Sequence, residues 1–230
     1  MKLTDDKHCF IPEEDQCGWR WGKGYELNPF LSTMKQIYKR NTALDIGAHV
    51  GIWSKRLASE FSDVVSFEPI PQHIECWIRN VKNDNVVLNK VAISDKIGTA
   101  TMKYINYFTG LSTLHYNAED IDYEFKILTK KYLNKFKRLT KEKILQKPED
   151  VIVETKTIDS YNFHNVDFIK MDVEGHELEA LTGAENTIRK YMPSIYIEIS
   201  NKDAYIFLTE LGYRQKEDFG NDHYLFKCVI

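Results

Sequence analysis

Cysteine is scarce in this chain of 230 residues, and no apolar run approaches the length of a membrane span. Its four cysteines, Cys9, Cys17, Cys76 and Cys228, are scattered, and none forms a C-x-x-C pair. This argues against a disulfide scaffold and predicts reduced thiols. The N-terminal letters M-K-L-T-D-D-K-H lack the apolar centre of a signal peptide. We therefore expect a soluble, cytoplasmic protein.

An excess of charge of one sign is also missing. The chain has 31 Lys and Arg against 34 Asp and Glu, so its net charge of −3 gives no general argument for nucleic acid or anionic membrane as a partner. Its 43% hydrophobic residues are ample for a single core. We expect one domain over residues 41–230, and an arm and helix over 1–40 that pack on this domain or cap it.

A glycine-rich turn follows a short apolar stretch near the start of that domain. Residues 43–46 are typical of a buried strand, Gly47 and Gly51 flank a turn, and a helix is expected from Ile52. Free N–H groups of the new helix would face a ligand above the turn. The spacing D-x-G-x-x-x-G has His49 where a dinucleotide site has its second glycine, which favours a cofactor without phosphates there.

A carboxylate ends the next predicted strand. Glu68 follows residues 64–67, seventeen positions after Gly51, where an acid can accept hydrogen bonds from both hydroxyls of a ribose. Together with Asp45 at the end of the first strand, Glu68 predicts a nucleoside site. The turn taken alone is equally consistent with tight packing, which also requires glycines.

The rest of the chain alternates predicted strands and helices. We expect helices over 28–40, 52–61, 71–81, 177–192 and 203–211, and strands over 86–93, 151–157, 167–172, 194–198, 213–218 and 223–229. Such alternation predicts a mostly parallel sheet with helices on both faces and a ligand site at the carboxyl ends of the strands.

Acidic residues follow two of these strands. Asp172 ends one strand, Glu174 and His176 lie on the turn after it, and Glu198 ends the next strand. Transfer of a group to a hydroxyl requires a proton acceptor. His176 is the first choice because its ordinary pKa suits proton transfer near neutrality, and Asp172 is the second.

The same acidic cluster is also consistent with a structural role or a metal site. Asp172 and Glu174 could stabilise the N-terminus of the following helix. Alternatively, Asp172, Glu174 and Glu198, with or without His176, could hold Mg²⁺ or Mn²⁺, since oxygen ligands suit these ions, but no metal spacing is specific enough to assert this.

Two further segments bear on the acceptor. Ser112 and Thr113 could line an acceptor pocket or simply belong to a turn. Residues 123–147, within a predicted helical insertion over about 116–150, combine many lysines with apolar residues at helical spacing. This basic amphipathic helix could be a solvated face or oligomer contact, a surface that steers an anionic acceptor, or a site of peripheral membrane contact.

Five blocks of the sequence together resemble the FkbM family of class I S-adenosylmethionine-dependent methyltransferases. They are L-D-I-G-A-H-V-G-I-W-S (44–54), F-E-P (67–69), V-A-I-S-D (91–95), D-F-I-K-M-D-V-E-G-H-E-L-E-A-L (167–181) and I-Y-I-E-I (195–199). The resemblance implies a Rossmann-like three-layer α/β sandwich whose seven strands have the order 3-2-1-4-5-7-6, with strand seven antiparallel.

The resemblance also implies a reaction and a set of contacts. S-adenosylmethionine would be the cofactor and S-adenosylhomocysteine the product, and the acceptor would be a sugar hydroxyl of a glycan, glycolipid or glycosylated metabolite. The residues that we expect at the cofactor are Asp45, Gly47, Ala48, His49, Gly51, Glu68, Pro69, Val91, Ala92 and Asp172, of which Val91 and Ala92 come from the resemblance. The residues that we expect in catalysis are His176, Asp172 and Glu174, and those that we expect at the substrate are Ser112, Thr113 and Glu198.

Three other functions compete with this one. A nicotinamide oxidoreductase is disfavoured by His49 and by the lack of a Tyr-x-x-x-Lys pair. An RNA ribose 2′-O-methyltransferase could use the acids and the lysines, but confinement of the basic charge to one segment disfavours nucleic acid. A non-catalytic binding protein would have no use for the second cluster of acids.

Overall fold

The computed structural model describes residues 1–15, 17–18, 20–106, 109–114, 148–199 and 201–229. The basic helix expected over 123–147, with most of the predicted insertion around it, lies outside these residues. No helix in the described part of the chain has the length and apolar composition that a membrane span requires.

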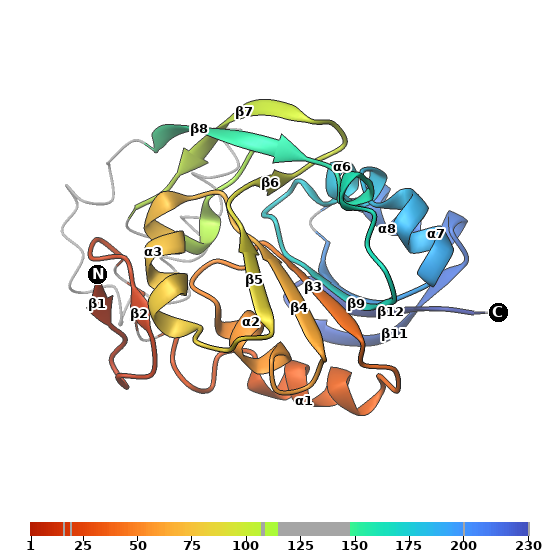
Figure 1. Ribbon diagram of the computed structural model, residues 1–230, viewed down its shortest axis with the longest axis horizontal. Coiled ribbons are helices and arrows are strands. Elements are labelled where there is room, and N and C mark those ends of the chain that lie inside the picture. The colour runs from red at the N-terminus through yellow and green to blue at the C-terminus, as the bar shows by residue number, and fades with distance from the viewer. Residues whose placement is uncertain (16, 19, 107–108, 115–147, 200, 230) are drawn as a thin grey trace.

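A seven-stranded sheet forms the centre of the molecule (Figure 1). Its strands are β3 (Thr42–Ile46), β4 (Asp63–Phe67), β5 (Val86–Asn89), β9 (Val166–Met171), β10 (Ser194–Glu198), β11 (Tyr213–Gly220) and β12 (His223–Cys228). Across the sheet the order is β11-β12-β10-β9-β3-β4-β5. Numbered along the chain, this is 3-2-1-4-5-7-6 read from the opposite edge, and β12 runs antiparallel to both of its neighbours.

Helices cover both faces of this sheet. They are α1 (Leu27–Lys35), α2 (Ile52–Leu57), α3 (Pro71–Asn80), α6 (Glu177–Thr182), α7 (Glu185–Tyr191) and α8 (Lys202–Glu210). Alternate strand residues point to opposite faces, so Phe168 packs with α1 and α2, whereas Ile169 packs with α6, α7 and α8. The predicted Rossmann-like α/β sandwich is therefore confirmed.

A smaller sheet lies beside the first and corrects one expected strand. Its strands are β6 (Ala92–Ile93), β7 (Gly98–Tyr104) and β8 (Glu149–Lys156), in the order β6-β8-β7. The strand expected over 86–93 is in fact split, because β5 ends at Asn89 opposite Phe67, where β4 also ends. Residues beyond Asn89 thus have no neighbour in the main sheet, and the chain pairs with β8 instead.

The arm before α1 forms a short hairpin of β1 (Lys2–Leu3) and β2 (Phe10–Ile11) against α3. Asn80 of α3 holds β2 by accepting from the Phe10 N–H at 2.7 Å and donating to its carbonyl at 2.8 Å. The helix after the arm is shorter than the expected 28–40, since it begins at Leu27 and ends at Lys35. The helix expected over 52–61 likewise ends at Leu57.

The single helix expected over 177–192 is two helices, α6 and α7, separated at Gly183 and Ala184. The carboxylate of Asp159 explains the second start, because it accepts hydrogen bonds from the Asn186 and Thr187 N–H groups at 3.0 and 2.8 Å. At Gly183 the backbone comes so close to β6 that an added Cβ would lie 2.0 Å from the Ser94 carbonyl oxygen.

Substitution of Gly183 by Ala should destabilise the protein. The new methyl group would force the α6–α7 corner away from Ser94, and overpacking of this kind costs about 1–3 kcal/mol. Urea unfolding followed by circular dichroism measures the loss. Gly24→Ala is the matched control, because its Cβ would meet nothing within 4 Å; equal stability of the two variants would contradict the close contact.

Candidate active site

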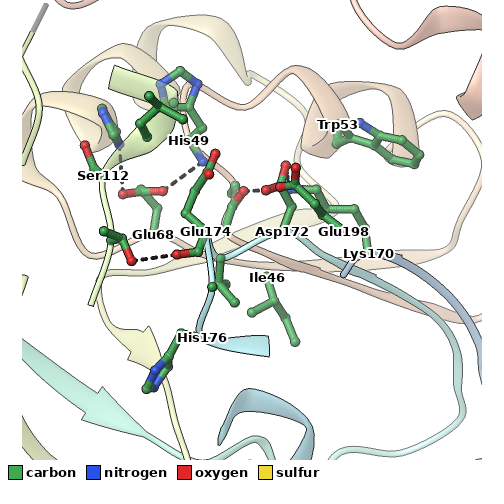
Figure 2. Close-up of a pocket in the computed structure, with 18 of the residues that line it drawn as sticks. Ile46, His49, Trp53, Glu68, Ser112, Lys170, Asp172, Glu174, His176 and Glu198 are labelled. Carbon is green, nitrogen blue, oxygen red and sulfur yellow. Dashed lines mark hydrogen bonds and ion pairs between the residues drawn. The ribbon is translucent and has the colours of Figure 1, made fainter. Parts of the chain in front are cut away.

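A cavity of about 950 Å³ opens at the carboxyl ends of the central parallel strands (Figure 2). The predicted residues Gly47, Ala48, His49, Glu68 and Asp172 all contribute to its wall. The turns after β3, β4, β9 and β10 supply most of its floor, and residues of the N-terminal arm supply much of the rest. The site therefore lies at the sheet edge that the alternation of elements predicts.

The turn after β3 is fixed by backbone contacts. Gly47 has φ 78°, and an added Cβ would lie 1.8 Å from the Asp172 carbonyl oxygen, so a larger residue does not fit. The N–H groups of Gly47 and Ala48 donate to the Phe67 carbonyl at 3.1 and 3.0 Å. The turn thus joins the ends of β3, β4 and β9.

Glu68 lies at the cavity wall, with 4% of its surface exposed. Its Oε1 accepts from the Ile70 N–H at 2.9 Å and contacts Nδ1 of His73 at 3.1 Å, and its Oε2 accepts from the His49 N–H at 2.8 Å. Each carboxylate oxygen offers two lone pairs. One lone pair of Oε2 is therefore left for a ligand. The sequence led us to expect that Glu68 could accept hydrogen bonds from both hydroxyls of a ribose.

Two predicted cofactor residues do not reach the cavity wall. Asp45 is fully buried beneath the turn, where its Oδ2 accepts from the Ser54 hydroxyl at 2.6 Å. Gly51 has φ 89° at the start of α2, and an added Cβ would meet Val81 and Trp77. We therefore correct their roles, because both support the turn from behind. The remaining predicted cofactor residues, Pro69, Val91 and Ala92, line the cavity.

A buried lysine that sequence reasoning missed connects the turn to the acids. Lys170 of β9 is 3% exposed, and its ammonium donates to the Gly47 carbonyl at 2.7 Å. It also lies 3.7 Å from Asp45 and 3.5 Å from Asp172. Burial alone would lower the pKa of Lys170, but the two carboxylates raise it above its ordinary value. A charged residue within the apolar strand V-D-F-I-K-M was the signal that could have found it.

The acids at the ends of β9 and β10 are close together, as Figure 2 shows for Asp172 and Glu198. Burial raises the pKa of Glu174 well above its ordinary value, and the carboxylates of Glu198 and Asp172 raise it further. Burial, with Asp172 beside it, likewise raises the pKa of Glu198. Burial works in the same direction on Asp172, yet Lys170 and His223 outweigh it and keep the pKa of Asp172 below its ordinary value.

Glu174 adopts a left-handed backbone with φ 52°, which is rare for a residue with a side chain. Its carbonyl accepts from the Thr113 hydroxyl at 2.6 Å, and Gly175 follows it with φ 96°. The structure therefore holds Glu174 in a strained conformation at the cavity wall, a combination often found at functional sites.

His176 does not join this cluster. It lines the cavity, but in Figure 2 its ring points away from Asp172, Glu174 and Glu198. Its Nε2 is 2.9 Å from the Ser94 hydroxyl, and its Nδ1 is 3.6 Å from a carboxylate oxygen of Glu179. The structure thus separates His176 from the acids with which the sequence grouped it.

The predicted substrate residues Ser112 and Thr113 line the cavity, but their hydroxyls already serve the protein. Ser112 donates to the Thr109 carbonyl at 3.0 Å and accepts from the Ile105 N–H at 3.2 Å. Thr113 donates to the Glu174 carbonyl. Both side chains therefore fix the loop geometry, and their predicted contact with an acceptor stays a prediction.

One group of side chains in the described part of the chain could hold a divalent cation. Ligand atoms of Asp172, Glu198 and His223 lie within 4.8 Å of one another. The set differs from the one considered from the sequence, because His223 of β12 takes the place of Glu174. Nδ1 of His223 lies 2.7 Å from the Asn221 carbonyl, a contact that leaves Nε2 facing the acids and Glu26, which is 3.3 Å away.

The N-terminal arm contributes more to the cavity than its sequence indicates. Arg20, Trp21, Tyr25 and Glu26 all line it. Glu26 accepts from Nε1 of Trp53 at 2.6 Å, so the arm is joined to α2. These contacts depend on tertiary structure, and the aromatic residues and glycines of the arm were the signal available for them.

Comparison with known proteins identifies a family and several relatives. The sequence model of one protein family, the Methyltransferase FkbM domain, matches residues 45–215 of this chain. "Methyltransferase 1" of Beauveria bassiana (strain ARSEF 2860) is 22% identical over an alignment of 187 residues, and the match covers 77% of this chain and 69% of that protein. The crystal structure of methyltransferase FkbM from Methylobacillus flagellatus KT is 16% identical, with a TM-score of 0.53, and the match covers 84% of this chain. This chain spans 45% of the length of that one, and the likeness concerns the fold.

Replacement of Lys170 by Met should strongly destabilise the protein. The variant would leave Asp45 and Asp172 without their shared cation in a buried site, and breaking a buried ion pair costs about 3–5 kcal/mol. Urea unfolding at pH 7 measures this loss. Lys227→Met, at a lysine that donates to the Gln36 carbonyl, is the control. A Lys170→Met protein as stable as the control would show that the ammonium is not needed.

Proposed function

Because the chain belongs to the FkbM methyltransferase family, we propose that it transfers the methyl group of S-adenosylmethionine to a hydroxyl, and specifically to that of a sugar in a glycan, glycolipid or glycosylated metabolite. One observation carries the proposal beyond methyl transfer in general. The turn that holds Glu68 and the acids after β9 and β10 face the same cavity. A nucleoside donor and a hydroxyl acceptor can therefore meet there.

The donor half of the proposal rests on the turn after β3. The Glu68 carboxylate keeps a lone pair for a ribose hydroxyl, and the apolar residues Val91 and Ala92 offer a surface for the adenine. Gly47 and Ala48 line the cavity, so their backbone can come close to the ligand. The sulfonium and α-ammonium groups of the donor would then lie toward the acids of β9 and β10.

The acceptor half rests on those acids. A hydroxyl loses its proton as it attacks the methyl carbon, and a carboxylate with a raised pKa is a stronger base than an exposed one. Glu174 has such a pKa, raised by its burial and by Glu198 and Asp172. The positive charge of a bound sulfonium donor would favour the ionised form of Glu174, which then takes the proton. Glu174 therefore replaces His176 as our first choice of proton acceptor.

The choice of a sugar hydroxyl comes from the family resemblance, and the basic segment over 123–147 favours an acceptor that carries negative charge. Mg²⁺ or Mn²⁺ at Asp172, Glu198 and His223 would lower the pKa of a bound hydroxyl. Assays of methyl transfer to neutral and anionic sugar acceptors, each with and without Mg²⁺ or Mn²⁺, test the choice of acceptor and the need for a metal ion.

Glu68→Gln should weaken the binding of S-adenosylhomocysteine. The loss of a charge-assisted hydrogen bond costs about 1.5–3 kcal/mol, which is roughly a 10- to 150-fold rise in Kd. Isothermal titration with S-adenosylmethionine, S-adenosylhomocysteine and NAD measures this. Glu75→Gln, at an exposed position of α3, is the control. If the wild-type protein binds neither sulfur nucleoside, the proposed donor is wrong.

Glu174→Gln should lower kcat by about 10² to 10⁴ without a large change in the donor Kd, because the amide cannot take the proton. His176→Ala should have a much smaller effect, since its ring points away from the acids. Both are measured by transfer of a radiolabelled methyl group. The opposite ranking, with His176→Ala nearly inactive and Glu174→Gln active, would restore His176 as the base.

A further inference from the structure

Three side chains from distant parts of the sequence form a hydrogen-bonded chain that ends at the cavity. Asp15 comes from the N-terminal arm, Thr109 from the short 3₁₀ helix Thr109–Leu111, and His49 from the turn after β3. The Thr109 hydroxyl lies 2.6 Å from Oδ2 of Asp15 and 2.9 Å from Nε2 of His49. The contacts therefore fix the positions of the arm, the 3₁₀ helix and the His49 side chain relative to one another.

The direction of the hydrogen bonds is set at Asp15. Its side chain is fully buried, and four donors surround it: the N–H groups of Cys17 at 2.6 Å and Thr109 at 3.2 Å, Nε1 of Trp21 at 3.3 Å, and the Thr109 hydroxyl. The side-chain oxygens of Asp15 act as acceptors toward all four donors. The single proton of the Thr109 hydroxyl therefore points to Asp15.

The state of His49 follows from this direction. Because the Thr109 hydroxyl has given its proton to the bond with Asp15, it accepts from His49, and Nε2 of His49 carries the ring proton. Burial lowers the pKa of His49 well below its ordinary value, so the ring is neutral. Nδ1 then keeps a lone pair, and no hydrogen bond reaches that atom from the residues that the structure describes. His49 is one of the residues that line the cavity.

Glu68 offers another acceptor for a nucleoside in the same cavity. The backbone N–H of His49 donates to Oε2 of Glu68, so the two residues are adjacent at the wall, and Oε2 has one lone pair left. The diol of a ribose has two protons to donate. Glu68 can receive one of them, and a second acceptor is needed for the other.

We propose that Asp15 and Thr109 are positioning residues that hold His49 in the Nε2–H tautomer, so that its Nδ1 accepts a hydrogen bond from a ribose hydroxyl beside Glu68. This inference rests on the proposed use of a sulfur nucleoside as donor. It gives the N-terminal arm a role in donor binding, because Asp15 acts on the ligand through two other side chains. His73 is a second histidine beside Glu68, and its Nε2 has no hydrogen-bond partner among the described residues. Its Nδ1 contacts Glu68 directly, so Asp15 and Thr109 do not act on it.

The tautomer is tested first, by ¹⁵N NMR of the full-length protein labelled at histidine. In the wild-type protein and in Thr109→Ser, which keeps the hydroxyl, His49 should show the Nε2–H form. In Thr109→Val, which has the same shape without the hydroxyl, the Nδ1–H form should gain population. A wild-type His49 with its proton on Nδ1 would overturn the proposal, whether or not the protein binds a sulfur nucleoside.

Donor binding is tested next, by titration with S-adenosylhomocysteine and its 2′-deoxy and 3′-deoxy analogues. Thr109→Val and Asp15→Asn should bind S-adenosylhomocysteine about tenfold more weakly, whereas Thr109→Ser should bind it like the wild type. With one of the deoxy analogues the wild type and Thr109→Val should bind equally, because the hydroxyl that His49 recognises is gone.

Asp6→Asn controls for general loosening of the arm, since Asp6 bonds only to arm residues among those described, accepting from Thr4, His8 and Lys23. It should leave the affinity unchanged. Equal affinity of Thr109→Val and the wild type for S-adenosylhomocysteine, or the same loss with both deoxy analogues, would refute the ribose contact. A wild-type protein that binds no sulfur nucleoside refutes the donor itself, while the NMR result still decides the tautomer.

Discussion

The site depends on one buried positive charge. The ammonium of Lys170 lies beneath the turn after β3, bonded to the Gly47 carbonyl and close to Asp45 and Asp172. Without it, two carboxylates on neighbouring strands would be buried with no cation between them, at a cost that their mutual repulsion increases. The ion group therefore fixes the relative position of β3 and β9. Since Gly47 begins the turn after β3 and Asp172 begins the acidic cluster, both parts of the cavity wall take their position from this ion group.

The cavity wall is completed by segments that are far apart in the chain. Trp21 of the arm packs against the His49 ring, with centroids 4.7 Å apart, and Gly110 lies so close to Trp21 that an added Cβ would be 2.6 Å from the indole. Glu26 joins the arm to His223 at 3.3 Å. The arm is therefore more than a packing element, because Trp21 and Glu26 contact the turn after β3 and the last strand. A change at either of these two residues is expected to alter the cavity.

Local sequence rules explain why part of this arrangement could be predicted. An apolar strand, a turn with glycines and a carboxylate at the end of the next strand are local features, and they placed Gly47 and Glu68 at the wall of the cavity. Asp172 and Glu198 follow from the same rule, because parallel strands end at one edge. Contacts between distant segments have no such rule. The break between α6 and α7 at Gly183 depends on the nearby Ser94 carbonyl, and the orientation of the His176 ring depends on the Ser94 hydroxyl. The burial of Lys170 depends on the two acids beside it.

The charge of the cavity indicates which ligands it favours. Three acids, Asp172, Glu174 and Glu198, line the cavity, and the nearby Lys170 is already paired with Asp45 and Asp172. Burial and the neighbouring acids disfavour the ionised forms of Glu174 and Glu198, so the pKa values of both are raised. A ligand that brings positive charge relieves this repulsion, whereas the pyrophosphate of a dinucleotide would add to it. The sulfonium donor that we propose would bring that charge to the acids. When its methyl group leaves, the sulfur would become neutral and this attraction would be lost, so the same electrostatics that favour binding of the donor would also favour release of the product.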